Sequence, residues 1–394
     1  MAGSVIVAGA RTPIGKMSGG LSGFTAAQLG GFAIKAALER AGVTPEMVDY
    51  VFMGQVLMAG QGQVPSRQAA VNGGIPLHVP ATNVNKVCLS GINSIYLADL
   101  MINAGEADIV VAGGMESMTN APYLLPSGRA GARYGNTEML DAIIKDGLWC
   151  AFESCLMGLG TEKYAASAGL SRLAQDEAAA QSHERAANAI KEGRFADEII
   201  PVSIPQRKGE PLLFDTDEGV RPGTTAESLG ALKPAFDKAG NITAGNASQI
   251  SDGGSAVIVA SKKAAERLDV HPLGEIVSYG QVAGPDNVSL LSQPSRAIQN
   301  ALSKVGMKVG DVDLFELNEA FAAVGLASMA DLGITDEIVN VNGGAIALGH
   351  PIGMSGNRLT LAILHELRRR GGGVGAAALC GGGGQGDAII VRSL

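Results

Sequence analysis

Long apolar runs are missing from this sequence. No segment approaches about 18 uninterrupted apolar residues, roughly the length that a membrane-spanning helix needs, so we expect no membrane crossing. Cysteine is scarce as well: the four are Cys88, Cys150, Cys155 and Cys380, at no zinc-finger or redox-motif spacing. Few cysteines and no recognisable secretory or transit signal predict a cytoplasmic protein with reduced thiols and no bound metal.

An excess of basic residues is also missing. Lys and Arg together number 30 against 38 Asp and Glu, a formal net charge of −8, which argues against a broad nucleic-acid-binding surface. Hydrophobic residues make up 46% of the 394 residues, as expected of a globular chain with room for two or three domains. The 55 glycines follow no collagen-like period, so we expect them at turns and close backbone approaches.

Strand and helix patterns alternate over the first part of the chain. We expect strands at 4–8, 48–57 and 108–112, and helices at 25–41, 65–72 and 92–104. Such alternation is typical of βαβ units and predicts an α/β fold with a mostly parallel sheet.

The pattern changes between about residues 119 and 245. Prolines, tight turns and charged loops surround one polar amphipathic helix at 172–191. Strand patterns resume at 254–260 and 276–281. We therefore expect an inserted lobe that interrupts an α/β domain.

The chain contains an internal repeat. Three segments of the first half match three of the second half in the same order: 37–53 with 301–317, 90–91 with 355–356, and 112–114 with 380–382. The shared order argues against a chance match. The chain therefore consists of two similar α/β halves, the first of which carries the insertion.

The register of this repeat places Asn85 opposite His350. Both halves thus offer a turn before a helix at the same structural position, and Cys88 lies three residues beyond Asn85. If the halves pack about a pseudo-twofold axis, the two turns face each other across one cleft. Ligands in such sheets bind beyond the carboxyl ends of strands, where Cys380 is also expected.

Cys88 and His350 form a candidate nucleophile and base. A buried structural cysteine is the commoner occurrence for this residue type, but a Cys–His pair is the usual activated nucleophile. The expected helix N-terminus at Cys88 favours the thiolate and a lowered thiol pKa. Residues 381–386 spell G-x-G-x-x-G, but too little chain follows for a dinucleotide site, so we expect these glycines to form an oxyanion hole beside Cys380.

Four motifs in this order resemble those of the thiolase family: 85–91 with Cys88, 318–321 (Asn-Glu-Ala-Phe), 342–356 with His350, and 380–386. The resemblance covers essentially the whole chain and is strongest to the biosynthetic acetoacetyl-CoA thiolases of bacteria. It implies a duplicated α/β fold, two βαβαβαββ halves packed as a five-layered α-β-α-β-α structure. It also implies three units: 1–118 with 249–270, an inserted CoA-binding loop domain at 119–248, and 271–394.

The resemblance also implies residue roles. Cys88 takes an acetyl group from acetyl-CoA, His350 deprotonates Cys88, and Cys380 removes a proton from a second acetyl-CoA. The product is acetoacetyl-CoA, formed in a Claisen condensation whose reverse is thiolysis. Asn318 positions a water in one oxyanion hole, and the N–H groups of Cys88 and Gly382 form the other.

Coenzyme A contacts follow from the same resemblance. Arg221 lies against the adenine–phosphate end, Ser248 contacts the pantetheine, and Met157 and Phe236 wall the acyl pocket. The set of CoA-site residues is completed by Phe321 and Leu156.

Three positions depart from the family pattern. Leu156 stands where many biosynthetic thiolases have histidine, and Met354 and Asn357 replace common alanines.

The expected partners are nevertheless acetyl-CoA, acetoacetyl-CoA and CoA as substrates, with no permanently bound cofactor and no nucleic acid. A homo-oligomer, dimer or tetramer, is expected.

Three other functions compete with this reading. A degradative 3-ketoacyl-CoA thiolase would use the same residues on longer chains. A ketoacyl synthase shares the fold but is expected to pair its cysteine with two histidines, and Cys380 argues against it. A non-catalytic thiolase-like protein that binds CoA or lipid would be expected to lack Cys88, His350 or Cys380, and all three are present.

Overall fold

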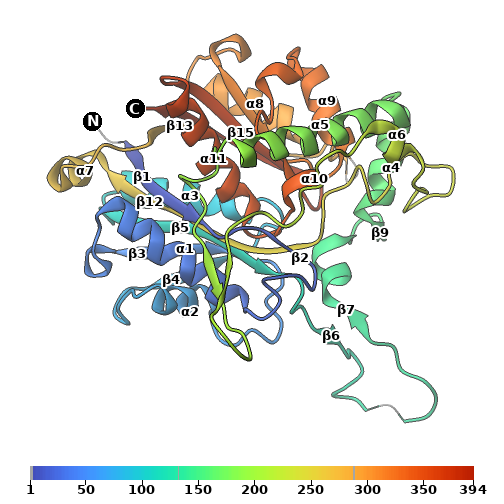
Figure 1. The fold of residues 1–394 in the computed structure, drawn as a ribbon, viewed down its shortest axis with the longest axis horizontal. Helices are drawn as coiled ribbons and strands as arrows, with labels where there is room; N and C mark the ends of the chain where they lie inside the picture. Colours follow the sequence, from blue (N-terminus) through green and yellow to red (C-terminus); the bar gives the residue numbers. More distant parts are fainter. Residues whose placement is uncertain (1–2, 132, 287–288) are drawn as a thin grey trace.

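Two copies of one strand–helix unit build the protein. The computed structural model describes residues 3–131, 133–286 and 289–394. The elements of the first unit are β1 (Ser4–Arg11), α1 (Ala26–Ala41), β3 (Tyr50–Gly54), α2 (Pro65–Asn72), β4 (Ala81–Val84), α3 (Ser90–Asn103), β5 (Ile109–Ser117) and β12 (Ser251–Ser261). Those of the second are β13 (Gly274–Ala283), α8 (Gln293–Lys304), β14 (Leu314–Leu317), α9 (Ala322–Leu332), α11 (Ser355–Arg369), β15 (Gly373–Gly381) and β16 (Gln385–Ser393). Figure 1 shows the first unit in blue to cyan, with its last strand β12 in yellow, and the second unit in orange to red.

The strands run in the order β14-β15-β16-β13-β1-β12-β5-β3-β4, with the short β2 (Gly15–Lys16) paired to β12. The two halves of this sheet meet only at β1 and β13, through the pairs Val5–Glu275 and Ile6–Gly274. The prediction of a mostly parallel sheet is wrong, because among the strands of the described residues only the pairs β3–β4, β3–β5 and β14–β15 are parallel. In each half the last two strands are antiparallel to each other: β5 to β12 in the first half and β15 to β16 in the second. The apolar composition of these strands does not reveal their direction.

Five layers result from this arrangement. One apolar cluster joins the first half-sheet to its outer helices α1 and α2, and another joins the second half-sheet to its outer helices α8 and α9. A third cluster unites the inner faces of both half-sheets through α3 and α11. The expected α-β-α-β-α order is confirmed, with α3 and α11 as the middle layer.

Local sequence explains where the helices begin and end. Thr25 accepts from the Gln28 amide in a capping box at the start of α1, and Gly42 ends that helix at φ +63°. Ser171 caps α5 (Arg172–Lys191) by accepting from the Ala174 amide. The predicted helices 65–72 and 172–191 are therefore confirmed to the residue.

The two middle helices meet in a reciprocal contact. A Cβ built on Gly91 of α3 would lie 2.8 Å from the Asn357 amide nitrogen, and one built on Gly356 of α11 would lie 2.5 Å from the Ile92 amide nitrogen. The repeat register makes Gly91 equivalent to Gly356 and Ile92 to Asn357. Such an exchange of equivalent contacts is the mark of a twofold relation, here between halves of one chain.

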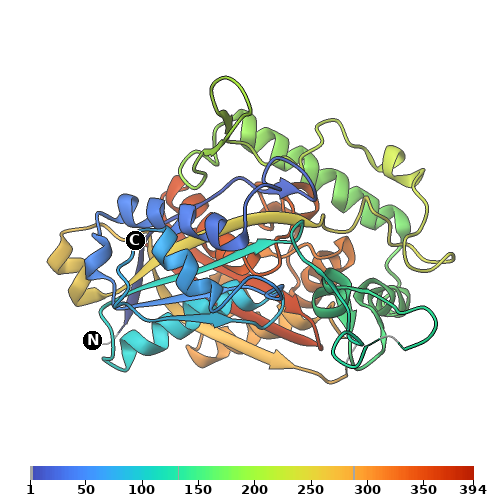
Figure 2. The ribbon, with the colours of Figure 1, turned by 90° about the horizontal axis from the view of Figure 1, so that it is seen from below.

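The chain leaves the sheet between β5 and β12. The elements of this excursion are β6 (Tyr123–Leu124), β7 (Leu140–Asp141), a π-helical turn (Ile143–Leu148), β8 (Trp149–Cys150), β9 (Cys155–Leu156), α4 (Met157–Ser167), α5, β10 (Val202–Ile204), β11 (Leu212–Phe214) and α6 (Ala226–Gly230). Figures 1 and 2 place α5 (green) at the periphery, and α5 packs on α9 and on the short α10 (Ala345–Leu348). The segment carrying β6 and β7 projects from the body as an arm. The remaining short elements of the described chain are α7 (Lys262–Leu268) and the 3-10 turns Pro45–Met47, Val309–Asp311 and Asp336–Ile338.

Candidate active site

Cys88 lies in a turn between β4 and α3. The turn is tied by Ser90, whose Oγ accepts from the Lys86 amide at 2.8 Å and donates to the Val87 carbonyl at 2.6 Å. Val87 adopts a left-handed φ of +52°. The helix begins at Ser90, so Cys88 precedes it by two residues rather than opening it as predicted. The Cys88 side chain is only 6% exposed.

Glycines bring the histidine turn against this cysteine turn. A Cβ built on Gly114, in β5, would lie 2.0 Å from the Gly353 carbonyl oxygen, and one on Gly54 would lie 2.7 Å from the same oxygen. No side chain fits at either position without moving the backbone of the turn. The turn that follows His350 therefore rests directly on the ends of β3 and β5.

The end of β15 covers the cysteine turn from the other half. A Cβ built on Gly381 would lie 2.6 Å from Leu89 Cγ, and one on Gly382 would lie 3.3 Å from Val87 Cγ2. Cys380 precedes these glycines and is 1% exposed. The structure thus brings Cys88, His350, Cys380 and Gly382 together, as the repeat register predicts.

His350 is held in one tautomer. Its Nδ1 lies 2.5 Å from Ser355 Oγ, and that hydroxyl donates its own hydrogen to the Pro351 carbonyl at 2.9 Å. Ser355 must therefore accept from Nδ1–H, which leaves the lone pair on Nε2. Asn318 Nδ2 lies 3.4 Å from Nε2 on the site side of the ring.

Asn318 presents an unused acceptor. Its backbone amide donates to the Ala378 carbonyl at 3.0 Å, which fixes it at the end of β14. Its Oδ1 is buried and has no hydrogen-bond partner within residues 3–131, 133–286 and 289–394. A buried polar atom of this kind is normally satisfied by water or ligand, and this fits the expected water-holding role.

Burial governs the protonation of the three groups. It raises the pKa of the Cys88 thiol far above its usual value, with a further rise from the neighbouring Cys380, so the expected lowering of the Cys88 pKa is wrong. Burial also raises the pKa of Cys380 to about 12 and lowers the pKa of His350 to about 4, with a smaller lowering from Arg358. At neutral pH the site therefore holds two neutral thiols and a neutral imidazole, a base that accepts a proton as sulfur attacks.

Glu116 fastens this geometry and was missed by the sequence analysis. The carboxylate is fully buried and accepts from the amides of Val56, Leu57 and Gly353 at 3.0 to 3.1 Å. It thereby ties the histidine turn to the loop after β3, and burial raises its pKa to about 7. A charged residue two positions after the Gly113-Gly114 pair was the available signal.

An apolar cavity of about 630 Å³ opens beside His350. Its lining includes most of the predicted CoA-site residues: Leu156, Met157, Phe236, Ser248 and Phe321. Cys88 packs in one cluster with the lining residues Met118 and Ile352, and Cys380 in another with Met157. Both sulfurs thus lie directly behind the cavity wall.

Two aromatic rings shape the cavity, and one of the predicted CoA-site residues lies outside its lining. Phe236 and Phe321 pack edge to face with centroids 6.1 Å apart. Arg221 is exposed and outside the lining, where its backbone amide donates to His183 Nδ1 at 3.2 Å. The adenine–phosphate end, where Arg221 is expected, lies away from the acyl end, and this placement of Arg221 stays a prediction.

Asn357, one of the three departures from the family pattern, is structural. It is fully buried, donates to the Ala112 carbonyl at 3.0 Å and accepts from Ser255 Oγ at 2.6 Å, so it ties α11 to β5 and β12. Met354 is also fully buried and packs with Ile14 and Leu348.

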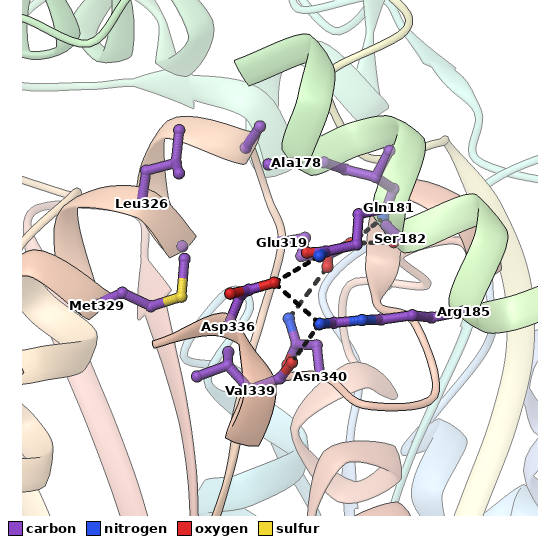
Figure 3. A pocket seen from close by; sticks show the side chains of 13 residues that line it. Ala178, Gln181, Ser182, Arg185, Glu319, Leu326, Met329, Asp336, Val339 and Asn340 are labelled. Carbon is purple, nitrogen blue, oxygen red and sulfur yellow. Dashed lines mark hydrogen bonds and ion pairs between the residues drawn. The ribbon is translucent and has the colours of Figure 1, made fainter. Parts of the chain in front are cut away.

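A second, narrow crevice of about 40 Å³ lies between α5 and the second half (Figure 3). At its base Glu319 accepts from Ser182 Oγ at 2.6 Å, from Asn340 Nδ2 at 3.1 Å and from the Ile346 amide at 3.1 Å. Figure 3 shows Arg185 of α5 beside Asp336, its ion-pair partner at 3.1 Å. This network occupies both carboxylate oxygens of Glu319.

Within the described part of the chain, no group of three or more His, Cys, Asp or Glu side chains has the arrangement of a metal site. None of the described helices combines the length and apolarity needed to cross a bilayer.

The fold and the site define a class of protein. The family model for the N-terminal domain of thiolase matches residues 4–263, and the model for its C-terminal domain matches residues 270–393. The chain belongs to the thiolase family.

Named relatives extend over the full length. A probable acetyl-CoA acetyltransferase of Mycobacterium tuberculosis is 57% identical over 393 residues, which is 100% of both chains. One of Mycolicibacterium smegmatis is 57% identical over 388 residues, 98% of this chain and 100% of the relative. The acetyl-CoA acetyltransferase of Cupriavidus necator is 51% identical over 388 residues, 98% of each chain.

Proposed function

We propose that this protein is an acetyl-CoA acetyltransferase, which condenses two acetyl-CoA molecules to acetoacetyl-CoA and CoA and catalyses the reverse thiolysis. One observation carries the proposal: Cys88 and Cys380 lie behind the wall of one apolar cavity, at which His350 presents an unprotonated Nε2. The full-length relatives named acetyl-CoA acetyltransferase support the choice of acyl group.

The first half-reaction loads the enzyme. Cys88 Sγ attacks the acetyl carbonyl carbon of acetyl-CoA while His350 Nε2 takes the thiol proton. The carbon–sulfur bond to CoA breaks, CoA leaves with a proton, and acetyl-Cys88 remains. Because burial disfavours a standing thiolate, the proton and the attack must be coupled.

The second half-reaction forms the carbon–carbon bond. His350, neutral again, takes the thiol proton of Cys380, whose sulfur removes a proton from the methyl group of a second acetyl-CoA, and the resulting carbanion attacks the carbonyl of acetyl-Cys88. The bond to Cys88 sulfur then breaks, that sulfur takes the proton held by His350, and acetoacetyl-CoA leaves. Asn318 with a water, and the amides of Cys88 and Gly382, hold the two developing oxyanions, where each preorganised donor contributes on the order of 3–4 kcal/mol.

The cavity lining supports the placement of the substrate. Met157, Phe236 and Phe321 would enclose the acyl end, with Leu156 on the same wall, and Ser248 would contact the pantetheine. Arg221, further out on the surface, would face the adenine–phosphate end. No cofactor is required beyond the CoA thioesters themselves.

Acetylation by acetyl-CoA alone tests the proposal. We expect intact-mass measurement to show one added acetyl group and peptide mapping to place it on Cys88. A label on Cys150 or Cys155, or no label, would overturn the assignment and favour a non-catalytic CoA-binding protein. Cys380→Ser is expected to form acetyl-Cys88 normally but to condense poorly, whereas equal loss of both half-reactions would refute a separate base.

Chain length separates this function from degradative 3-ketoacyl-CoA thiolysis. We expect thiolysis rates to fall steeply beyond acetoacetyl-CoA in a series of 3-ketoacyl-CoA substrates. A flat series would favour the degradative activity.

Assembly and location belong to the same proposal. We propose a cytoplasmic homo-oligomer, a dimer or tetramer. The projecting arm supports this, because it exposes Tyr123 by 64%, Leu125 by 47% and Met139 by 60%, apolar area that a second copy would cover. Light scattering of the intact protein and of a variant with these three residues changed to Ser tests the assembly.

A further inference from the structure

Two cysteines outside the reaction stand directly opposite each other. β8 and β9 form a small antiparallel hairpin whose register pairs Trp149 with Leu156 and Cys150 with Cys155. Both thiols are free, and they are 8% and 9% exposed. Their spacing in the sequence does not suit a metal site, and no role in the proposed reaction falls to either thiol.

Opposed positions of an antiparallel pair suit a disulfide. Their Cα atoms lie about 4.5–5.5 Å apart and their side chains share one face, which is inside the window of about 4.4–6.8 Å that disulfides use. The Glu153 amide lies 3.5 Å from Cys150 Sγ and donates to it across the connecting turn. The pair thus needs little backbone movement to join.

This hairpin lies between the cavity and the Cys380 strand end. Leu148, immediately before β8, and Leu156 and Met157, in and after β9, line the cavity. At the other end, Phe152 in the connecting turn lies against Gly383, since a Cβ built there would meet Phe152 Cε2 at 3.2 Å. A change in hairpin geometry therefore reaches both sides of the site.

We propose that Cys150 and Cys155 form a reversible disulfide that adjusts the wall of the acyl cavity to the redox state of the surroundings. The oxidant is a low-molecular-weight disulfide, RSSR. One thiolate attacks RSSR and releases RS⁻, and the second then attacks the protein sulfur of the mixed disulfide and releases another RS⁻. Overall, two protein thiols and RSSR give one protein disulfide and two RSH.

We expect the disulfide to alter the binding of acetyl-CoA more than the rate of the chemical steps. Joining the two sulfurs fixes the hairpin and shifts Leu156 and Met157, while Cys88, His350 and Cys380 lie on other elements. We expect the KM for acetyl-CoA to rise about tenfold, the effect of roughly one lost apolar contact in a pocket. This regulatory part rests on the proposed acetyltransferase function, whereas formation of the disulfide does not.

Trp149, the only tryptophan of the chain, reports the disulfide without any activity. It adjoins Cys150 and is 38% exposed. The intact protein is incubated with oxidised glutathione, and fluorescence, peptide mapping and acetyl-CoA kinetics are followed before and after dithiothreitol. We expect a Cys150–Cys155 cross-linked peptide, quenched Trp149 emission and a raised KM, all reversed by the reductant.

Two variants make the test decisive. The double variant Cys150→Ala with Cys155→Ala is expected to match the reduced wild type in kinetics and to keep its KM under oxidised glutathione. The variant Cys88→Ser, which lacks the expected nucleophile, should still form the cross-linked peptide and the fluorescence change.

Three outcomes would overturn the inference. The first is a cross-link between Cys88 and Cys380, or glutathionylation alone, in place of the Cys150–Cys155 peptide. The second is a Cys150–Cys155 disulfide that leaves KM unchanged. The third is a KM shift that persists in the double alanine variant. The acetyltransferase function is tested separately: it would be refuted if Cys88 of the reduced wild type carried no acetyl group after incubation with acetyl-CoA.

Discussion

Gly114→Ala places one methyl group under the histidine turn. The new Cβ would lie 2.0 Å from the Gly353 carbonyl oxygen and 2.8 Å from Met354 Cα. Real Cβ contacts below 3.0 Å essentially do not occur, so the turn must move by at least about 1 Å. Both contacts are with backbone, and no side chain can rotate to relieve them.

Two magnitudes follow from this displacement. Overpacking of a well-packed core costs about 1–3 kcal/mol of stability. A misplacement of about 1 Å at a catalytic group costs on the order of 10²-fold in rate. We therefore expect kcat/KM of Gly114→Ala to fall about 100-fold while the protein remains folded.

The matched control is Gly325→Ala in α9. A Cβ there meets no heavy atom within 4 Å, and the residue has helical backbone angles. It is expected to gain about 0.4–1 kcal/mol and keep full activity. Calorimetry and the rate of Cys88 acetylation are measured for both variants. Wild-type acetylation by Gly114→Ala would refute the view that this close approach positions His350.

Three further predictions concern groups around His350. Ser355→Ala removes the acceptor of Nδ1–H, so kcat should fall at least about tenfold and stability by about 1–3 kcal/mol, and an unchanged kcat would contradict the tautomer assignment. Because burial lowers the pKa of His350 to about 4, the acid limb of a kcat/KM–pH profile should lie near pH 4, and a limb near pH 6.5 would argue against His350 as the base. Burial raises the pKa of Glu116 from 4.5 to about 7, so between these values the native state binds more protons than the unfolded state. The free energy of unfolding then decreases as pH rises through this window, by at most roughly 3 kcal/mol. Urea titrations at pH 5 and pH 7 should show a smaller decrease for Glu116→Gln, and equal decreases in both proteins would exclude this contribution.

Local signals predicted the helices well. Pro65 stands at the first turn of α2 and Ser171 caps α5, so both helices begin where the sequence indicates. The repeat register, which needs no knowledge of packing, placed Asn85 and His350 at equivalent turns. Motif resemblance supplied the roles that neither signal contains.

Properties set by distant neighbours were not predictable. The direction of the Cys88 pKa shift depends on apolar groups such as Met118 and Ile352, which come from other segments. The antiparallel return of β12 leaves no mark in its apolar run. Ser355 and Glu116 act through hydrogen bonds to turns far away in sequence, and a pattern of residue types does not reveal such partners.

Because of the reciprocal contact of Gly91 and Gly356, the two halves of this chain pack against each other as the two subunits of a symmetric dimer do. Each half supplies some of the site residues and also the surface against which the site residues of the other half pack. Neither half alone can therefore hold its catalytic residues in place. Assembly of the reaction centre and completion of the fold are consequently one event. Lesions in the middle layer should remove structure and catalysis together, whereas lesions at the outer helices should separate them.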